Sequence, residues 1–257
     1  MNPFTSFEEK NIAYWTGRAP GYSAVNQEEL ATNQHAVWRG VLHDAISAHY
    51  PGKEPKQISV LDVGTGPGFF AIILAEQGYQ VTAVDYTEAM LRQARQNAGS
   101  LNIAFRRMNA QELTFSDNRF DVVISRNLTW NLNDPQAAYA HWTRVLKPGG
   151  LLLNFDANWY SYLFDAQARQ EHLQDRKNLA NSDVRDETAG TDVDAMEAIA
   201  YQTPLSQCRR PEWDKAVLTG LGITVTVHPE IWKQVWTREE RINNASTPMF
   251  LVQGVKG

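Results

Sequence analysis

The 257-residue sequence contains a single cysteine, Cys208, and this scarcity excludes several kinds of site. One thiol cannot form an internal disulfide, and it cannot supply the several thiolates of a cysteine-based structural zinc site. Iron–sulfur clusters also need several cysteine ligands, so radical chemistry based on such a cluster is excluded as well. The six histidines are scattered along the chain, and none of them forms a ligand pair of the His-x-x-x-His kind.

The chain also lacks an excess of positive charge and a long apolar run. Its 24 Lys and Arg residues are outnumbered by 29 Asp and Glu residues, which gives a formal net charge of −5. Nucleic-acid-binding surfaces normally carry a clear excess of Lys and Arg, so the composition argues against nucleic acid as a partner. No apolar run approaches the roughly 18 residues of a membrane span, and the first residues lack the features of a signal peptide. We therefore expect no membrane partner and a cytoplasmic location.

What the chain does have is an alternation of strand-like and helix-like segments up to about residue 156. Apolar runs typical of buried strands are followed by segments with helical spacing. Strands joined by helices of this length imply right-handed crossovers and a parallel sheet covered on both faces. We predict helices at 33–49, 68–77, 88–98 and 135–147, and strands at 58–63, 80–84, 102–107, 120–125 and 151–155.

The most informative stretch runs from Ile58 to Gly68, where an apolar run ends at three glycines, Gly64, Gly66 and Gly68. A buried strand, a tight glycine turn and a helix start bring backbone N–H groups close to a ligand. Seventeen residues later a second apolar strand ends at Asp85, a carboxylate that can hold the ribose of a nucleoside. The spacing is G-x-G-x-G and not the G-x-G-x-x-G of dinucleotide sites, which counts against NAD or FAD.

Five segments in order resemble the class I S-adenosylmethionine-dependent methyltransferases, particularly their small-molecule branch (methyltransferase type 11/25-like). The glycine loop alone would be a weak signal, whereas five segments in the family's order and spacing are specific. The resemblance implies an α/β fold with a doubly wound, mostly parallel seven-stranded sheet, the Rossmann-like methyltransferase fold. The five segments are 60–68, 84–85, 109–115, 120–124 and 144–150.

The pattern of the chain changes after residue 156, where a polar and helical segment precedes two further strand patterns at 222–227 and 248–253. No repeat or interdomain linker is present, so we predict a single domain over 1–257. Its predicted parts are an N-terminal helical flap (1–50), a cofactor-binding core (51–156), a helical insertion or substrate lid (157–220), and the last two strands (221–257).

The resemblance implies which residues hold S-adenosylmethionine. The loop Gly64–Gly68, with Thr65, would approach the methionine part of the cofactor, and Asp62 would lie near its amino group. Asp85 would accept hydrogen bonds from both ribose hydroxyls; the alternative is a solvated carboxylate at the end of a strand. Asn109 and the Ala110 amide would read the adenine, since the Asn109 side-chain oxygen can accept from the exocyclic amine.

Further predicted cofactor contacts come from other parts of the chain. Tyr86 and Met90 would pack on the adenosine faces, although Met90 could equally be a core residue of its helix. Arg126 would hold the methionine end. Tyr14 and Tyr22 belong to a segment that resembles the one such enzymes fold over the cofactor to exclude water. The alternative is that these two aromatic residues simply anchor a terminal helix.

Methyl transfer is an in-line displacement in which the protein contributes position, desolvation and, where needed, removal of one proton. The candidates for these roles are Asn127, Asp156, Tyr160 and His172. Asn127 would hold the methionine end or a polar group of the substrate, or would only cap its loop. Asp156, Tyr160 or His172 could act as a base, and Trp159 could wall an apolar substrate. Asp156 and Asn158 suggest magnesium, but Arg126 stands where a further carboxylate is needed, so we expect no metal.

We therefore predict an S-adenosylmethionine-dependent methyltransferase that acts on a small-molecule acceptor and releases S-adenosylhomocysteine. An RNA or protein methyltransferase is the nearest alternative, and the acidic stretch 183–194 does not favour it. A non-catalytic S-adenosylmethionine-binding module is a second alternative, and a nucleotide-dependent dehydrogenase is disfavoured by the glycine spacing. The acceptor atom (nitrogen, oxygen, sulfur or carbon) and the oligomeric state stay open.

Overall fold

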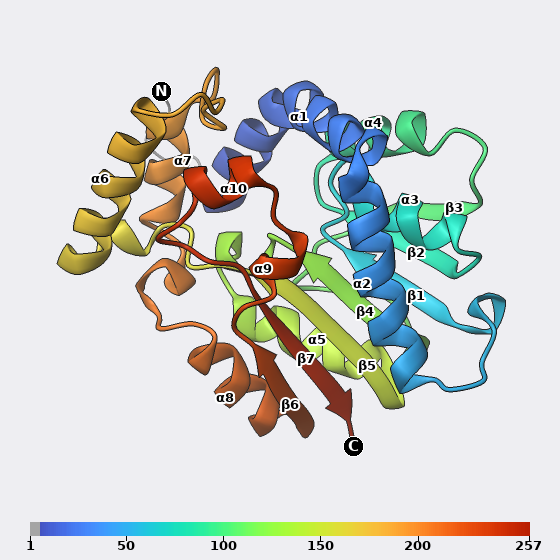
Figure 1. Ribbon diagram of the computed structural model, residues 1–257. Helices are drawn as coiled ribbons and strands as arrows, with labels where there is room; N and C mark the ends of the chain where they lie inside the picture. Colours follow the sequence, from blue (N-terminus) through green and yellow to red (C-terminus); the bar gives the residue numbers. More distant parts are fainter. Residues whose placement is uncertain (1–5) are drawn as a thin grey trace.

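The computed structural model describes residues 6–257, so the first five residues of the predicted flap lie outside it. Within this range the strands form one seven-stranded sheet in the order β3-β2-β1-β4-β5-β7-β6 (Figure 1). Strands β1 to β5 pair in parallel, and β7 pairs antiparallel with both β5 and β6. The predicted mostly parallel sheet is confirmed. Its strands are β1 (Ser59–Val63), β2 (Gln80–Asp85), β3 (Ile103–Arg107), β4 (Phe120–Arg126), β5 (Leu146–Asp156), β6 (Ile223–His228) and β7 (Phe250–Lys256).

Helices cover both faces of the sheet and extend beyond the carboxyl ends of the parallel strands (Figure 1). Successive residues of β1 and β4 face opposite layers: Val60 belongs to the core that contains α2 and α3, and Leu61 to the core that contains α5 and α8. The helices are α1 (Phe7–Ala31), α2 (Asn33–His49), α3 (Phe69–Glu76), α4 (Glu88–Ala98), α5 (Pro135–Val145), α6 (Ala166–Ala180), α7 (Val193–Ala200), α8 (Glu212–Gly220), α9 (Trp232–Val235) and α10 (Arg238–Asn243).

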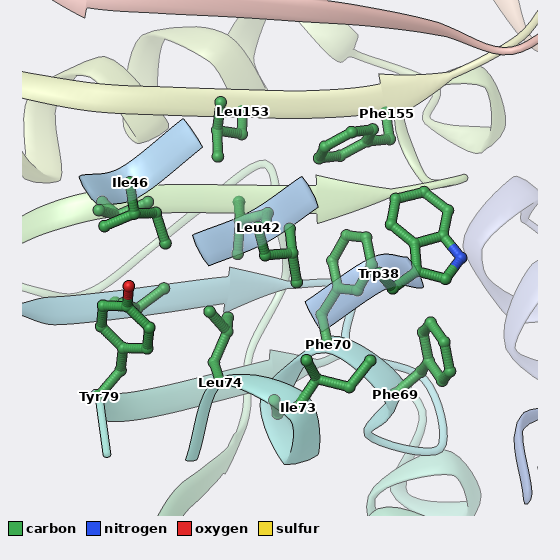
Figure 2. Close-up of a cluster of buried hydrophobic side chains, with 14 of the residues drawn as sticks. Trp38, Leu42, Ile46, Phe69, Phe70, Ile73, Leu74, Tyr79, Leu153 and Phe155 are labelled. Atoms are coloured by element: carbon green, nitrogen blue, oxygen red, sulfur yellow. The ribbon is translucent and has the colours of Figure 1, made fainter. Parts of the chain in front are cut away.

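The larger of the two cores is centred on Trp38 of α2, which is fully buried (Figure 2). Its ring centroid lies 5.0 Å from that of Phe70 in α3 and 5.2 Å from that of Phe155 in β5. Edge-to-face contacts of this kind add about 0.5–1.5 kcal/mol per pair to the free energy gained from burying the rings. The contacts fix α3, and therefore the glycine loop before it, against the sheet.

The ends of the helices follow the sequence signals in most places. Asp134 caps α5 by accepting a hydrogen bond from the Ala137 N–H at 2.9 Å, with a proline at the first helical position. Thr87 occupies the cap position of α4, but its side chain makes no capping bond. The predicted helix 135–147 ends earlier and the predicted strand 151–155 begins earlier, because Leu146 already pairs with Phe120 of β4 and the segment 147–150 is part of β5.

The helical segment after β5 has two different parts. Helix α8 packs against β6 as an ordinary layer of the fold, whereas α6 contacts α10 and α7 contacts α1. Figure 1 shows α6 and α7 away from the sheet, beside α1 and α10. The first part of the predicted 157–220 insertion therefore stands over the end of the sheet, and the last part belongs to the sheet's own covering.

Candidate functional site

The glycine loop turns sharply at the end of β1 and lies against β2. The N–H groups of Gly64 and Thr65 donate to the Val84 carbonyl at 2.8 and 3.0 Å. Gly64 has a positive φ of 70°, and a Cβ atom there would lie 2.6 Å from the Leu128 side chain. A larger residue at this position would have to distort both the turn and the loop after β4.

Two carboxylates flank the glycine loop, one from β1 and one from β2. Asp85 accepts hydrogen bonds from the backbone N–H groups of Gly66 at 3.0 Å and Thr87 at 2.8 Å. Asp62 accepts from the Thr65 hydroxyl at 2.6 Å. Burial raises the pKa of Asp62 to about 7 and the pKa of Asp85 to about 6, because the charged form of each loses solvation.

A cavity at the carboxyl ends of the strands brings most of the predicted cofactor residues together. The residues come from α1, the glycine loop, the end of β2, α4, the segment after β3 and the end of β4. A small recess beside it adds Asp62 and Thr65, and Gly68 lies just behind as the residue before α3. The predicted residues on the first cavity are Tyr22, Gly64, Gly66, Asp85, Tyr86, Met90, Asn109, Ala110, Arg126 and Asn127.

The segment 109–111 is held in place by its own hydrogen bonds. The Asn109 side-chain oxygen accepts from the Gln111 N–H at 3.0 Å, and the Ala110 carbonyl accepts from the Trp142 indole at 2.9 Å. Across the cavity, Tyr86 is 38% exposed, whereas Met90 is 3% exposed and packs against Ala19 of α1. Met90 is therefore a core residue that also lines the cavity, and its contact with adenosine stays a prediction.

The end of β4 carries two polar atoms that are buried without a hydrogen-bond partner among residues 6–257: the Arg126 Nε and the Asn127 side-chain oxygen. The Arg126 guanidinium pairs with Glu29 of α1 at 2.6 Å through another nitrogen. Asn127 has a positive φ of 55°, fixed by its N–H bond to the Phe155 carbonyl at 2.8 Å. A buried donor and a buried acceptor left open side by side are typical of a site that a polar ligand completes.

A second cavity of about 380 Å³ adjoins the first, and Trp15, Tyr22 and Asn127 line both. Predicted residues on its surface are Tyr160 and His172. The His172 ring is stacked on Tyr162 with a centroid distance of 3.9 Å. Partial burial lowers the pKa of His172, and burial raises the pKa of the Tyr160 hydroxyl well above its usual range.

Tyr14, predicted as a cofactor contact, lines the second cavity and not the first. On the α-helix α1 its neighbour Trp15 and Tyr22, one and eight residues further on, face the junction of the two cavities instead. Tyr22 lies over the glycine loop, with its ring 3.5 Å from the position of a Cβ atom at Gly66. The geometry therefore places Tyr14 on the second cavity, away from the residues predicted to hold the cofactor.

The prediction that Asp156 could act as a base is wrong. Asp156 is fully buried, lines neither cavity, and forms an ion pair with Arg210 at 2.8 Å. Its oxygens also accept from the N–H groups of Trp130 at 3.0 Å and Ala157 at 2.9 Å. A carboxylate with its charge paired and its oxygens occupied holds the loops after β4 and β5 in place and has no route to a substrate.

Several residues of the site carried no sequence signal that we could interpret. Trp130 lines the second cavity, and Glu29 comes from the far end of α1 to pair with Arg126. Arg210, which pairs with both Asp156 and Asp214 at 2.8 Å, lies 54 residues after the first of these carboxylates. Contacts between segments so far apart in the sequence form only when the chain folds, so no local pattern predicts them. In this region, only the aromatic residues of α1 gave a local sequence signal.

In residues 6–257, no group of three or more His, Cys, Asp or Glu side chains is placed to hold a metal ion. No helix in the same range is both long enough and apolar enough to cross a membrane.

The core of the chain is similar to known methyltransferases. Residues 61–154 match the family model described as a methyltransferase domain. This stretch contains the glycine loop, Asp85, Asn109 and the end of β4, so the predicted resemblance to class I methyltransferases is confirmed for the core of the chain. The S-adenosylmethionine-dependent methyltransferase of Mesorhizobium loti has the same fold, with a TM-score of 0.56 and 18% identity over 83% of this chain and 96% of that one.

Curated relatives match the same core. The demethylmenaquinone methyltransferase of Renibacterium salmoninarum is 35% identical over 52% of this chain and 53% of its own length. The ubiquinone biosynthesis O-methyltransferase of Alkalilimnicola ehrlichii is 36% identical over 51% of this chain and 54% of its own length. The chain thus spans about half the length of the curated relatives it matches.

Proposed function

We propose that this protein is an S-adenosylmethionine-dependent methyltransferase that acts on a small-molecule acceptor. The observation that carries the proposal is the first cavity, where the glycine loop, two carboxylates and the open polar atoms of Arg126 and Asn127 converge. The two matched relatives are named for methylating small molecules, which supports the choice of acceptor class.

The residues present fit S-adenosylmethionine group by group. Asp85 would accept hydrogen bonds from the ribose hydroxyls, and Asp62 would face the ammonium group of the methionine part. The open Arg126 Nε can donate to the methionine carboxylate, and the segment 109–110 would read the adenine. Tyr86 and Met90 would pack on the rings. The cofactor supplies a methyl group on a positively charged sulfur, which is a good leaving group.

The protein's own contribution is to orient the acceptor and to exclude water. Trp15 and Tyr22 of α1 stand between the two cavities, and the Glu29–Arg126 pair keeps α1 on the end of β4. Helices α6 and α7 would form the lid over the acceptor. A closed site of this kind strengthens electrostatic interactions inside it and keeps the sulfonium away from hydrolysis.

Two side chains of the second cavity, Tyr160 and His172, would have different roles toward protons of the acceptor. Because its pKa is raised, Tyr160 stays protonated near neutral pH, so we assign it hydrogen-bond donation to the acceptor and not the role of base. His172 has a lowered pKa and is neutral there, which leaves a ring nitrogen able to accept a proton. Asn127 would accept a hydrogen bond from the acceptor or from the cofactor through its open side-chain oxygen.

A transfer assay with radiolabelled S-adenosylmethionine and a cell-extract metabolite pool tests the proposed function. We expect label in low-molecular-weight products and none in RNA or protein. The Asp85→Ala variant should lose the transfer, and the Asp44→Ala variant, changed at an exposed position of α2, should retain it. Label retained in macromolecules would contradict the small-molecule assignment. The cytoplasmic location stays a prediction from the sequence.

A further inference from the structure

One side of the second cavity is a continuous aromatic wall. The rings of Trp130, Tyr160, Tyr162 and His172 follow one another with centroid distances of 4.9, 5.8 and 3.9 Å. Trp159 and Tyr14 line the same cavity. A wall of rings already packed on each other is rigid before a ligand arrives, so little conformational entropy is lost on binding.

The two tryptophans on this wall have no free N–H group to offer a ligand. The Trp130 indole donates to the Asn127 carbonyl at 2.9 Å, and the Trp159 indole donates to Asp156 at 3.2 Å. These two rings therefore offer the cavity aromatic surface without a free hydrogen-bond donor. Such surface attracts aromatic groups and cations, and tryptophan is the best of the cation–π partners.

The cavity also contains two carboxylates, which decide between those ligands. Asp175 of α6 is 5% exposed and accepts from the Ser246 N–H at 2.7 Å. Glu187, in the segment between α6 and α7, accepts from the Asn244 side chain at 3.0 Å. Over the described range 6–257, neither carboxylate has a Lys, Arg or His nitrogen within 4.0 Å.

Within residues 6–257, neither arginine of the cavity lining forms an ion pair with Asp175 or Glu187. Arg176 donates two hydrogen bonds to Asp186, one of them at 3.1 Å, so its charge is paired. Arg18 is the other basic residue on the lining, and it comes from α1, whereas the carboxylates come from α6 and the segment after it. The lining found in residues 6–257 contains no lysine.

We propose that the acceptor is a small cationic amine, held in the second cavity between the aromatic wall and the carboxylates of Asp175 and Glu187. The amine would bind as its ammonium ion and pass one N–H proton to a ring nitrogen of His172 on the same lining. Its freed lone pair would then form the N–C bond as the C–S bond of the sulfonium breaks, and S-adenosylhomocysteine would leave. The positive charge would gain cation–π attraction from the rings and Coulomb attraction from both acids. A phenol acceptor would develop negative charge as it reacts, and the same carboxylates would repel it. This inference rests on the proposed function, because it identifies the substrate class of that site.

The test compares two ligands of equal shape that differ in charge. Calorimetric titrations of the full chain loaded with S-adenosylhomocysteine would use choline, and then 3,3-dimethylbutan-1-ol, its uncharged isostere. We expect choline to bind at least about tenfold more tightly, because its positive charge is attracted by the aromatic rings and by both carboxylates, and the neutral alcohol has no such charge. Equal affinities, or tighter binding of the neutral alcohol, would overturn the amine assignment.

Two variants locate the effect in the cavity. Glu187→Gln and Asp175→Asn should each reduce the affinity for choline about fivefold or more and leave that for the alcohol unchanged, since only the charge attraction is lost. Glu171→Gln is the matched control, because it removes one charge from an exposed position of α6 one turn before Asp175. Glu187 is on the surface of its segment, so its variant tests the proposal even if Asp175→Asn does not fold.

Loading the protein with S-adenosylhomocysteine distinguishes a failure of the amine assignment from a failure of the proposed function. If wild-type protein does not bind S-adenosylhomocysteine, the proposed function fails and the amine assignment fails with it. If S-adenosylhomocysteine binds and the variants bind choline as tightly as the wild type, the methyltransferase proposal stands and the amine assignment is overturned.

Discussion

In the proposed function, Asp62 and Asp85 are the residues on which recognition of the cofactor would depend most strongly. Both side chains are held by the loop that they would help to close over the cofactor: Asp62 by the Thr65 hydroxyl, and Asp85 by the N–H groups of Gly66 and Thr87. Their geometry is therefore set before any ligand binds, and the free-energy cost of removing the two carboxylates from water arises on folding and not on ligand binding.

Replacing Asp85 by alanine should weaken the binding of S-adenosylhomocysteine by about 1.5–3 kcal/mol, because charge-assisted hydrogen bonds to the ribose are lost. Calorimetric titration of the variant against the wild type gives the difference directly. Asp44→Ala, which removes a carboxylate from an exposed position of α2, should bind as the wild type does. An unchanged affinity in Asp85→Ala would show that the ribose is held elsewhere.

The raised pKa values of the two acids predict a pH dependence. A carboxyl whose pKa is higher in the folded state stabilises the unliganded fold at low pH, and this contribution is lost as the pH rises through about 6 for Asp85 and about 7 for Asp62. Cofactor binding needs the ionised forms, so S-adenosylhomocysteine should bind about tenfold more weakly at pH 6 than at pH 8. Titrations at both pH values, repeated with Asp62→Asn, would measure the effect; a pH-independent wild type would contradict it.

At the scale of the elements, the position of α1 decides whether the site is closed. The Glu29–Arg126 pair joins the end of α1 to the end of β4, and both side chains are at most 14% exposed. The guanidinium also lies 4.9 Å from the Trp38 ring of α2 and 4.7 Å from the Phe69 ring of α3. Arg126 therefore connects α1, the sheet and α3, the helix that follows the glycine loop.

Changing Glu29 to glutamine should loosen α1 and lower the free energy of unfolding by about 1–3 kcal/mol, because a nearly buried guanidinium loses its closest counter-charge. Glu240, 4.0 Å from the same guanidinium, compensates in part. Urea denaturation measures the change, and limited proteolysis should cleave α1 faster than in the wild type. Glu28→Gln alters the exposed neighbouring residue and should behave as the wild type. Equal cleavage rates for the two variants would contradict this role for the pair.

At the scale of the whole molecule, a buried polar network joins the sheet to the segments on either side of it. Arg210, fully buried before α8, pairs with Asp156 at the end of β5 and with Asp214 of α8. Tyr139 of α5 donates to Asp214 and accepts from Asn154 of β5 at 2.8 Å. The network fixes the loops from which Trp130 and Trp159 extend into the second cavity.

Arg210→Leu should be among the most destabilising single changes in the chain, at about 3–5 kcal/mol, because two buried carboxylates would lose their common counter-charge. Chemical denaturation provides the measurement. Arg209→Leu, at the exposed neighbouring position, should change the free energy of unfolding by less than about 0.5 kcal/mol. Equal stability of the two variants would show that the buried network does not stabilise the fold.

The core of the fold was predictable because its signals are local. Buried parallel strands, the glycine turn and the cap at Asp134 each depend on neighbouring residues, so β1, β2, β4 and α5 lie close to their predicted positions. The start of β5 was misplaced because pairing with Phe120, 26 residues away, extends the strand through a glycine-rich stretch. Local turn residues gave no indication of that partner.

Only the residues of the first cavity could be predicted from the sequence as a group. Asp62 and Asp85 sit at the ends of neighbouring parallel strands, so the topology alone brings them together. Asp156 also ends a strand, and its position gave no sign that Arg210 would reach it from the far side of α6 and α7. The second cavity is assembled from α1, α6 and the loops around them, and such long-range packing has no short motif.

Calorimetric titration of the wild-type protein with S-adenosylhomocysteine tests the central claim most directly. We predict one binding site per chain with a dissociation constant in the micromolar range, which corresponds to a binding free energy of about −8 kcal/mol. No heat of binding at millimolar ligand, under conditions where the protein is folded, would contradict the assignment of the first cavity to this cofactor.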